Sequence, residues 1–180
     1  MIIEANNKRQ IILSVLVPDD VDQLSIYLHQ LSKETKMRFG PHQYDSNSIA
    51  NFYTSSNAYI GFVAREINKQ EIIAYSIVKI GFLDHDSFRL ESYGLNLDSN
   101  SDCTFAPSVD DRWQKLGIGK KMFEFILSDL KTRKIKRVIL WGGVQAANQN
   151  AIHYYLKNEF RILGEFEYNG NNYDMAFDIY

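Results

Sequence analysis

The residues best suited to chemistry form one stretch, Val109-Asp-Asp-Arg-Trp-Gln-Lys-Leu-Gly-Ile-Gly-Lys120. It stands between an apolar segment and the start of an amphipathic helix pattern. A helix start leaves about four backbone N–H groups without intrahelical acceptors, and with the helix dipole these groups bind anions. Gly117 and Gly119 allow close approach of a phosphate, while Lys120 and Lys121 add positive charge. The stretch therefore predicts a diphosphate site.

Two common nucleotide motifs do not fit this stretch. The dinucleotide fingerprint requires a third glycine where the chain has Met122, and the Walker A loop requires Ser or Thr where it has Lys121. A purely structural reading also exists, in which the two glycines only permit tight packing of a helix on a sheet. The motif alone leaves that reading open.

The stretch does not stand alone, and its surroundings point to one family. Gln114-Lys-Leu-Gly-Ile-Gly119 resembles the Gln/Arg-x-x-Gly-x-Gly/Ala signature of the GNAT superfamily of N-acetyltransferases. Further along the chain, Asn148 to Phe160 resembles the second signature, Asn-x-x-Ala-x-x-x-Tyr-x-x-x-Gly-Phe, in register. The one departure is Glu159, which stands where glycine is usual. The resemblance is strong from about Thr104 to Phe166, and the N-terminal half fits by element order.

The resemblance implies acetyl-CoA as co-substrate, with no metal. The glycine-rich turn would bind its pyrophosphate through backbone amides, and the preceding strand would splay from its parallel neighbour and pair with the pantetheine arm. A splayed strand also tolerates Pro107, which cannot donate to a ladder. The implied cofactor-binding residues are Ser108, Val109, Gln114, Lys115, Leu116, Gly117, Ile118, Gly119, Lys120 and Asn148.

Tyr155 is the catalytic residue that the resemblance implies. It would protonate the thiolate of coenzyme A as it leaves, which general acid catalysis typically accelerates by about 10²–10⁴-fold. Asn148 and Tyr155 are spaced to lie two turns apart on one helix face. Without the signature, Tyr155 reads as a half-buried aromatic residue of an amphipathic helix.

The general base is not identified by the sequence. Many GNAT enzymes use a glutamate near the start of the strand before the glycine-rich turn, and this chain has none there. Glu91 and Asp102 are the nearest acids, and each by itself reads as a solvated surface charge. His153 reads as a surface residue because it points to a different helix face from Tyr155. Cys103 reads as a small buried thiol rather than a nucleophile.

The acceptor side is expected in the loop between the first two helices, because loops there help to form it in this family. Phe39, His42, Tyr44 and Phe52 are the candidate lining residues. The simpler reading is that these aromatic side chains fill the core. The four histidines are too scattered for a metal site.

The elements that would position these residues follow from hydrophobic patterning. The last strand alternates Tyr173, Met175, Phe177 and Ile179 with Asp174, Ala176 and Asp178, so one of its faces should be buried. The Asn169-Gly170 pair predicts the hairpin turn before it. Strands are expected at 10–17, 58–66, 71–82, 104–109, 137–141, 160–168 and 171–179, and helices at 20–33, 46–53, 118–132 and 148–157.

This order predicts an α/β (α+β) fold, with a mixed central sheet of about seven strands flanked by about four helices. Residues 104–141 form a strand–helix–strand crossover, which should make those two strands a parallel pair and, by the resemblance, a splayed one. No repeat or linker interrupts the chain, so residues 1–180 are expected to form a single GNAT-like domain.

Composition restricts the partners. The chain has 180 residues with 45% apolar and 23% charged residues, a net charge of −2 and one cysteine. These values fit a globular protein in a reducing compartment and lack the basic surface of a nucleic-acid binder. The run Ile11–Val17 is too short to span a membrane, and no cleavage site follows it. We therefore expect a cytoplasmic location, no nucleic acid and no membrane; a homodimer is left open.

The predicted function is acetyl-CoA-dependent N-acetylation of a primary amine, by direct attack in a ternary complex. The acceptor is left open among small amines, amino sugars, peptide N-termini and lysine. One alternative is an acyl-CoA-binding or sensing module of the same fold without turnover. The other is a different diphosphate ligand in an unrelated α/β fold.

Overall fold

The computed structural model describes residues 1–180, which divide into two compact units. The first unit comprises Met1–Val78 and Ala106–Ser128, and the second comprises Lys79–Phe105 and Asp129–Tyr180. Strands β4 (Ile72–Ile80) and β5 (Asp102–Val109) and helix α5 (Ile118–Thr132) each contribute residues to both units.

The first unit contains the N-terminal strands and three helices besides α5. Its strand order is β1-β2-β3-β4-β5, and β1 and β2, like β2 and β3, pair antiparallel. The element bounds are β1 (Ile2–Glu4), β2 (Gln10–Val15), α1 (Val21–Gln30), α2 (Lys33–Arg38), α3 (Ser46–Thr54) and β3 (Tyr59–Glu66), and a 3-10 turn (Asp111–Trp113) precedes α5.

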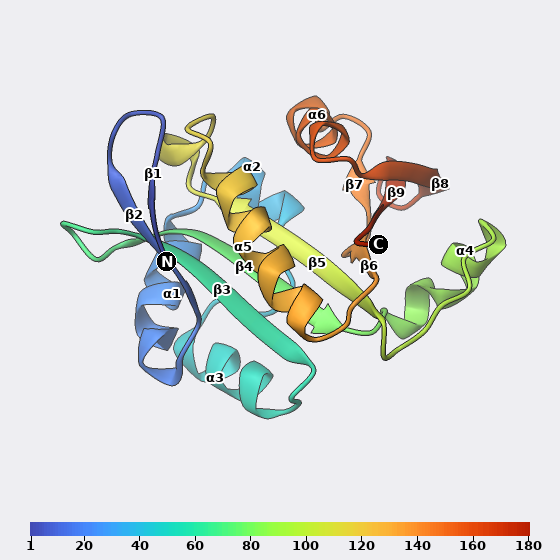
Figure 1. Ribbon diagram of the computed structural model, residues 1–180, viewed down its shortest axis with the longest axis horizontal. Coiled ribbons are helices and arrows are strands. Elements are labelled where there is room, and N and C mark those ends of the chain that lie inside the picture. Colours follow the sequence, from blue (N-terminus) through green and yellow to red (C-terminus); the bar gives the residue numbers. More distant parts are fainter. The chain divides into compact units, whose positions relative to one another are not determined.

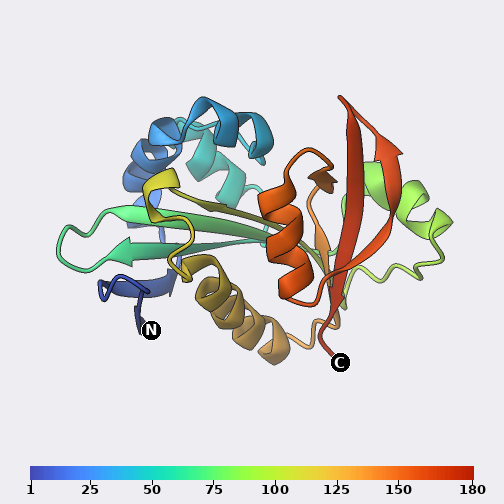
Figure 2. The same cartoon turned by 90° about the horizontal axis from the view of Figure 1, so that it is seen from above.

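Helices cover both faces of the strands in this unit. Figure 2 shows α5 on one side of β3 and β4, and α1 and α3 on the other. Neighbouring residues of β4 point to opposite faces, as strand geometry requires. Ser76 therefore reaches Met122 of α5, while Tyr75 reaches Tyr53 of α3. Tyr75 is fully buried between these layers.

The second unit contains the rest of the sheet. Its strand order is β4-β5-β6-β9-β7, with β8 beside β9. The element bounds are α4 (Ser87–Ser92), β6 (Arg137–Leu140), β7 (Val144–Gln145), α6 (Gln149–Lys157), β8 (Arg161–Glu167) and β9 (Asn171–Asp178). Leu90, Leu95, Ile139 and Ala176 form its hydrophobic cluster.

Strands β5 and β6 form the predicted parallel pair, so the crossover from residue 104 to 141 is confirmed (Figure 1). Their register runs from Asp102 opposite Arg137 to Phe105 opposite Leu140. Strand β5 itself continues to Val109, beyond the last residue paired with β6. Pro107 lies in this continuation, where the missing N–H breaks no bond of the parallel ladder.

The mixed α/β class is confirmed, and the element count is higher than expected. The chain forms nine strands and six α-helices, where patterning predicted about seven and four. The additional elements are all short: β1, β7, α2 and α4 have three, two, six and six residues. Segments of this length contain too few periods for a pattern to be read. Among the six helices, none combines the length and apolar character needed to cross a bilayer.

The final hairpin is also confirmed, with one correction. Strands β8 and β9 pair antiparallel, and Asn169 and Gly170 both adopt positive φ, at 49° and 105°. The expectation of a single buried face was wrong, because Asp174 is only 1% exposed. Its carboxylate pairs with Arg89 of α4 at 2.6 Å, so the burial is compensated by charge.

Candidate functional site

The glycine-rich turn starts at the end of β5 and is held by its own polar side chains. Asp110 accepts a hydrogen bond from the Arg112 backbone N–H and pairs with its guanidinium. The Gln114 amide donates to the Val109 carbonyl oxygen and to the Asp111 carboxylate, both at 3.2 Å. Gln114 therefore ties the turn back onto the strand end.

The backbone of this turn needs conformations that favour glycine. Lys115 has φ 60° and Gly117 has φ 81°. An added Cβ at Gly117 would lie 3.1 Å from the Asn6 side-chain oxygen. Both the torsion angle and the close neighbour therefore select glycine at position 117.

Unpaired amides gather where the turn enters α5. The first backbone bond of this helix runs from the Lys121 N–H to the Gly117 carbonyl oxygen, at 3.3 Å. The N–H groups of Gly117, Ile118 and Lys120 donate to no protein atom. No acidic residue lies in the first turn of the helix. Donors of this kind at a helix N-terminus can bind an anion such as a diphosphate.

Ser108 and Val109 present different groups at the end of β5. The Asp110 N–H donates to the Ile73 carbonyl oxygen on β4, so by strand alternation the main chain of Ser108 also faces β4. The Ser108 hydroxyl donates to the Tyr75 carbonyl oxygen (3.1 Å) and contacts the Tyr27 hydroxyl (3.0 Å). The Val109 N–H faces the opposite edge of β5, which makes Val109 the better placed of the two for main-chain contact with a ligand.

In the second unit, α6 and its N-cap carry Asn148 and Tyr155, the two residues of the second signature with an implied role. Asn148 is the N-cap of α6, where its side-chain oxygen accepts from the Ala151 N–H at 3.2 Å. Tyr155 is buried, and its ring packs against Tyr154 and Phe160 at centroid distances of 5.2 Å. The Tyr155 hydroxyl makes no hydrogen bond within the chain, and burial raises its pKa. It is a protonated donor whose hydrogen-bonding capacity is not used by the protein.

The departure from the family signature at Glu159 is a local feature of the helix end. Glu159 has φ 66°, and the Phe160 N–H donates to the Tyr155 carbonyl oxygen at 3.0 Å. This is the Schellman ending, whose left-handed residue is usually glycine. Glu159 therefore ends the helix in the conformation that glycine adopts most readily, at the position where the signature has glycine.

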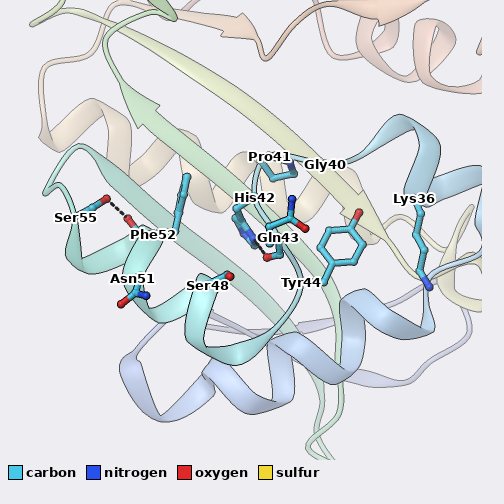
Figure 3. A pocket seen from close by; sticks show the side chains of 10 residues that line it. All are labelled: Lys36, Gly40, Pro41, His42, Gln43, Tyr44, Ser48, Asn51, Phe52 and Ser55. Carbon is cyan, nitrogen blue, oxygen red and sulfur yellow. Dashed lines mark hydrogen bonds between the residues drawn. The ribbon is translucent and has the colours of Figure 1, made fainter.

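An open depression of about 780 Å³ lies in the first unit, at the loop between α2 and α3 (Figure 3). Figure 3 shows Lys36 at one end and Ser55 at the other, with His42 and Tyr44 between them. Of the four expected lining residues, His42, Tyr44 and Phe52 line it, and Phe39 is buried. No carboxylate is among its lining residues.

His42 links this depression to the strand beside β5. Its Nδ1 lies 2.7 Å from the Gln43 carbonyl oxygen and its Nε2 lies 2.9 Å from the Tyr75 hydroxyl. The carbonyl can only accept, so Nδ1 carries the proton, and the neutral ring accepts at Nε2 from Tyr75. Tyr53 in turn bonds to the Tyr75 hydroxyl. Burial lowers the pKa of His42, which keeps the ring neutral. Neither tyrosine was singled out in the sequence, because their role depends on this contact.

The remaining candidates lie elsewhere. Asp102 is fully buried and bonded to Arg137 at 3.0 Å, so the reading as a solvated charge was wrong. Glu91 and His153 are exposed, and Cys103 is fully buried with a raised pKa. No group of three or more His, Cys, Asp or Glu residues is placed to hold a metal ion.

Comparison with known proteins identifies the family of this chain. The model of the acetyltransferase (GNAT) family matches residues 27–160. The chain belongs to the GNAT family. Acetyl transfer is thus its class of activity. No curated protein sequence matches the chain.

Solved structures of this family share the fold at low sequence identity. The GNAT domain of S. lividans PAT is 19% identical, with a TM-score of 0.77 over 99% of this chain and 96% of that one. The acetyltransferase yncA from Salmonella typhimurium, solved with acetyl-CoA, is 13% identical with a TM-score of 0.70 over 94% of both chains. A spermidine N-acetyltransferase chimera from Vibrio cholerae and hSSAT is 16% identical, with a TM-score of 0.68 over 94% of this chain and 95% of that one.

Proposed function

We propose that this GNAT protein transfers the acetyl group of acetyl-CoA to a primary amine, by direct attack in a ternary complex. The observation that carries the proposal is the set of unpaired amides of Gly117, Ile118 and Lys120 at the start of α5. In a GNAT chain, a diphosphate-sized anion at this turn is the pyrophosphate of the acetyl donor. We also propose that residues 1–180 act as one acetyltransferase domain.

The residues present fit coenzyme A. Its pyrophosphate would be held by the turn Gln114–Lys120, where Gly117 adopts positive φ and carries no side chain to crowd the amides. Val109 would supply main-chain contacts to the pantetheine arm, with Ser108 beside it and Asn148 as a further contact. Acetyl-CoA supplies the activated acyl group as a thioester.

Tyr155 is proposed as the general acid. Burial raises its pKa, so the phenol is protonated and can donate a hydrogen bond to the sulfur of the departing thiol. As the C–N bond forms and the C–S bond breaks, the proton of Tyr155 would pass to the sulfur, and the proton lost by the amine nitrogen would reach the phenolate through solvent. The Val109 N–H would stabilise the negative charge on the acyl oxygen during attack.

The depression around His42 is proposed as the acceptor site. Tyr75 connects it to β5, because Tyr75 bonds to His42 through its hydroxyl and to Ser108 through its carbonyl oxygen. The lining carries Lys36 and no carboxylate, which disfavours a polyamine with several positive charges. We therefore propose an acceptor with a single amine and a neutral or anionic remainder, such as an amino sugar, an amino acid or a peptide N-terminus.

The test follows thiol release from acetyl-CoA with a panel of amines, together with calorimetric titration of coenzyme A and of ATP. We expect coenzyme A to bind, ATP to bind much more weakly, and release to depend on a singly charged amine. Tighter binding of ATP than of coenzyme A would contradict the donor assignment.

The alternative is an acyl-CoA-binding module without turnover. It is favoured by one observation, the pairing of the buried Asp102 with Arg137, which leaves no free carboxylate at the start of β5. Tight binding of coenzyme A without thiol release for any amine of the panel would support this alternative.

A further inference from the structure

The loop between β1 and β2 bonds to the glycine-rich turn at Leu116, and two further contacts join residues in or beside the loop to residues that flank the turn, all within the first unit. The Asn6 backbone N–H donates to the Leu116 carbonyl oxygen at 3.0 Å. The Lys121 ammonium donates to the Glu4 carbonyl oxygen at 2.8 Å. The Arg9 guanidinium lies 4.9 Å from the centroid of the Trp113 ring. Figure 1 shows this loop beside the segment that leads into α5.

The bond from Asn6 fixes the orientation of one peptide plane. In a trans peptide the C=O and the following N–H point in opposite directions. The Leu116 carbonyl oxygen points to Asn6, so the Gly117 N–H points away from the loop, where it meets no protein acceptor. This amide is one of the three proposed to hold the pyrophosphate.

The loop itself is firmly held. The Lys8 N–H donates to the Ala5 carbonyl oxygen and the Ala5 N–H donates to the Arg9 carbonyl oxygen, both at 2.9 Å. Ala5 is only 2% exposed. The Asn6 side chain also occupies the space that a side chain at Gly117 would need. A loop bonded in this way can hold the glycine-rich turn in one conformation, which lowers the cost of ordering that turn on binding.

We infer that the β1–β2 loop is the positioning element of the phosphate-binding turn, and that the Asn6 backbone N–H presets the Gly117 amide for the pyrophosphate of coenzyme A. The inference rests on the proposed function. The loop lies outside residues 27–160, the part of the chain that matches the family model. Asn6 acts here through Leu116 and contacts no substrate.

One pair of variants tests the hydrogen bond. Asn6 is the second residue of the turn Ala5–Lys8, a position that favours proline, so Asn6→Pro suits the turn; it removes the N–H and the side chain and places a ring carbon where the N–H pointed at the Leu116 carbonyl oxygen, which pushes the two segments apart. Asn6→Ala removes the side chain and keeps the N–H. We expect Asn6→Pro to weaken coenzyme A binding about fivefold relative to Asn6→Ala, as measured by calorimetry.

Steady-state kinetics distinguish a loss of pyrophosphate binding from a general structural defect of the variant. In Asn6→Pro we expect the KM for acetyl-CoA to rise about fivefold, with kcat unchanged. The kcat/KM for S-acetylpantetheine, which lacks the pyrophosphate, should match that of Asn6→Ala. A loss of kcat, or an equal loss with S-acetylpantetheine, would indicate a structural defect and overturn the inference.

The outcomes distinguish this inference from the proposed function. If the parent protein binds no coenzyme A, the proposed function and the inference both fail. If the parent binds it and both Asn6 variants bind equally well, only the inference fails. Should Asn6→Pro not fold, Arg9→Ala takes its place, since it removes the contact with Trp113; a coenzyme A affinity equal to that of the parent would then overturn the inference.

Discussion

Replacing Gly117 by alanine should weaken coenzyme A binding far more than it weakens the fold. Gly117 has φ 81°, a conformation that costs an L-residue about 1–2 kcal/mol. Loss of glycine flexibility in the unfolded chain returns about 0.4–1 kcal/mol. The added Cβ would meet the exposed Asn6 side chain at 3.1 Å, and that side chain can rotate away. We therefore expect a net loss of about 1 kcal/mol in the free energy of unfolding.

The chain offers a matched control in Gly94. Its φ is 82°, nearly the same as that of Gly117, and an added Cβ would meet no atom within 4 Å. Gly94→Ala should therefore also cost about 1 kcal/mol, through backbone strain alone. Gly94 follows α4, away from the glycine-rich turn in sequence, and should leave the affinity for coenzyme A unchanged.

The affinity is where the two variants should differ. Relief of strain at position 117 rotates the peptide that carries the Gly117 N–H, and a hydrogen bond to a charged group contributes about 1.5–3 kcal/mol. This range corresponds to about 10- to 150-fold weaker binding of coenzyme A. Urea unfolding gives the stabilities and calorimetric titration gives the affinities. If Gly117→Ala and Gly94→Ala bind coenzyme A equally well, the Gly117 amide is not a phosphate ligand.

Four further outcomes follow from individual side chains. Tyr155→Phe should lower kcat by about 100-fold or more and leave the KM for acetyl-CoA within twofold of the parent value, because the Tyr155 hydroxyl makes no hydrogen bond within the chain. If steady-state kinetics give the variant the kcat and KM of the parent, Tyr155 is not the general acid. Burial lowers the pKa of His42 in the folded protein, so the unfolded chain binds the extra proton first and stability should fall as pH drops below about 6.5. Between pH 7.5 and pH 5, the free energy of unfolding measured with urea should fall less for His42→Gln than for the parent. An equal fall in both proteins would contradict the lowered pKa of His42. Glu159→Gly should raise the free energy of unfolding by up to about 1 kcal/mol, since glycine adopts the φ of 66° at this position without strain. A lower free energy of unfolding, measured by urea titration, would refute this interpretation of the helix end. Cys103 is fully buried, so Ellman's reagent should label it only after unfolding, and rapid labelling of the native protein would show otherwise.

The sequence determined the long elements and the chemistry that they carry. Helix α5 and the final hairpin were predicted because their patterns extend over several periods or use a turn pair such as Asn169-Gly170. The glycine-rich turn could also be found, since Gly117 and Gly119 at a helix start bring their own donors with them. Such properties are local, so the sequence shows them directly.

Tertiary structure decided which polar groups are free and which are paired. Asp102 and Asp174 have the sequence context of surface charges, yet Arg137 and Arg89 pair with them in the interior. His42 and Tyr75 are 33 positions apart and became partners only through packing of the loop before α3 against β4.

The contact partner of the loop around Asn6 also could not be predicted from the sequence. Nothing near residue 6 in the sequence indicates a role at a helix that starts at residue 118, because the contact joins two segments through a single backbone bond. Local patterns report what a residue can do, whereas its partner depends on how distant segments are brought together. For this chain the sequence indicated the donors of the proposed diphosphate site, and only the fold showed the loop that bonds to the peptide of one of them.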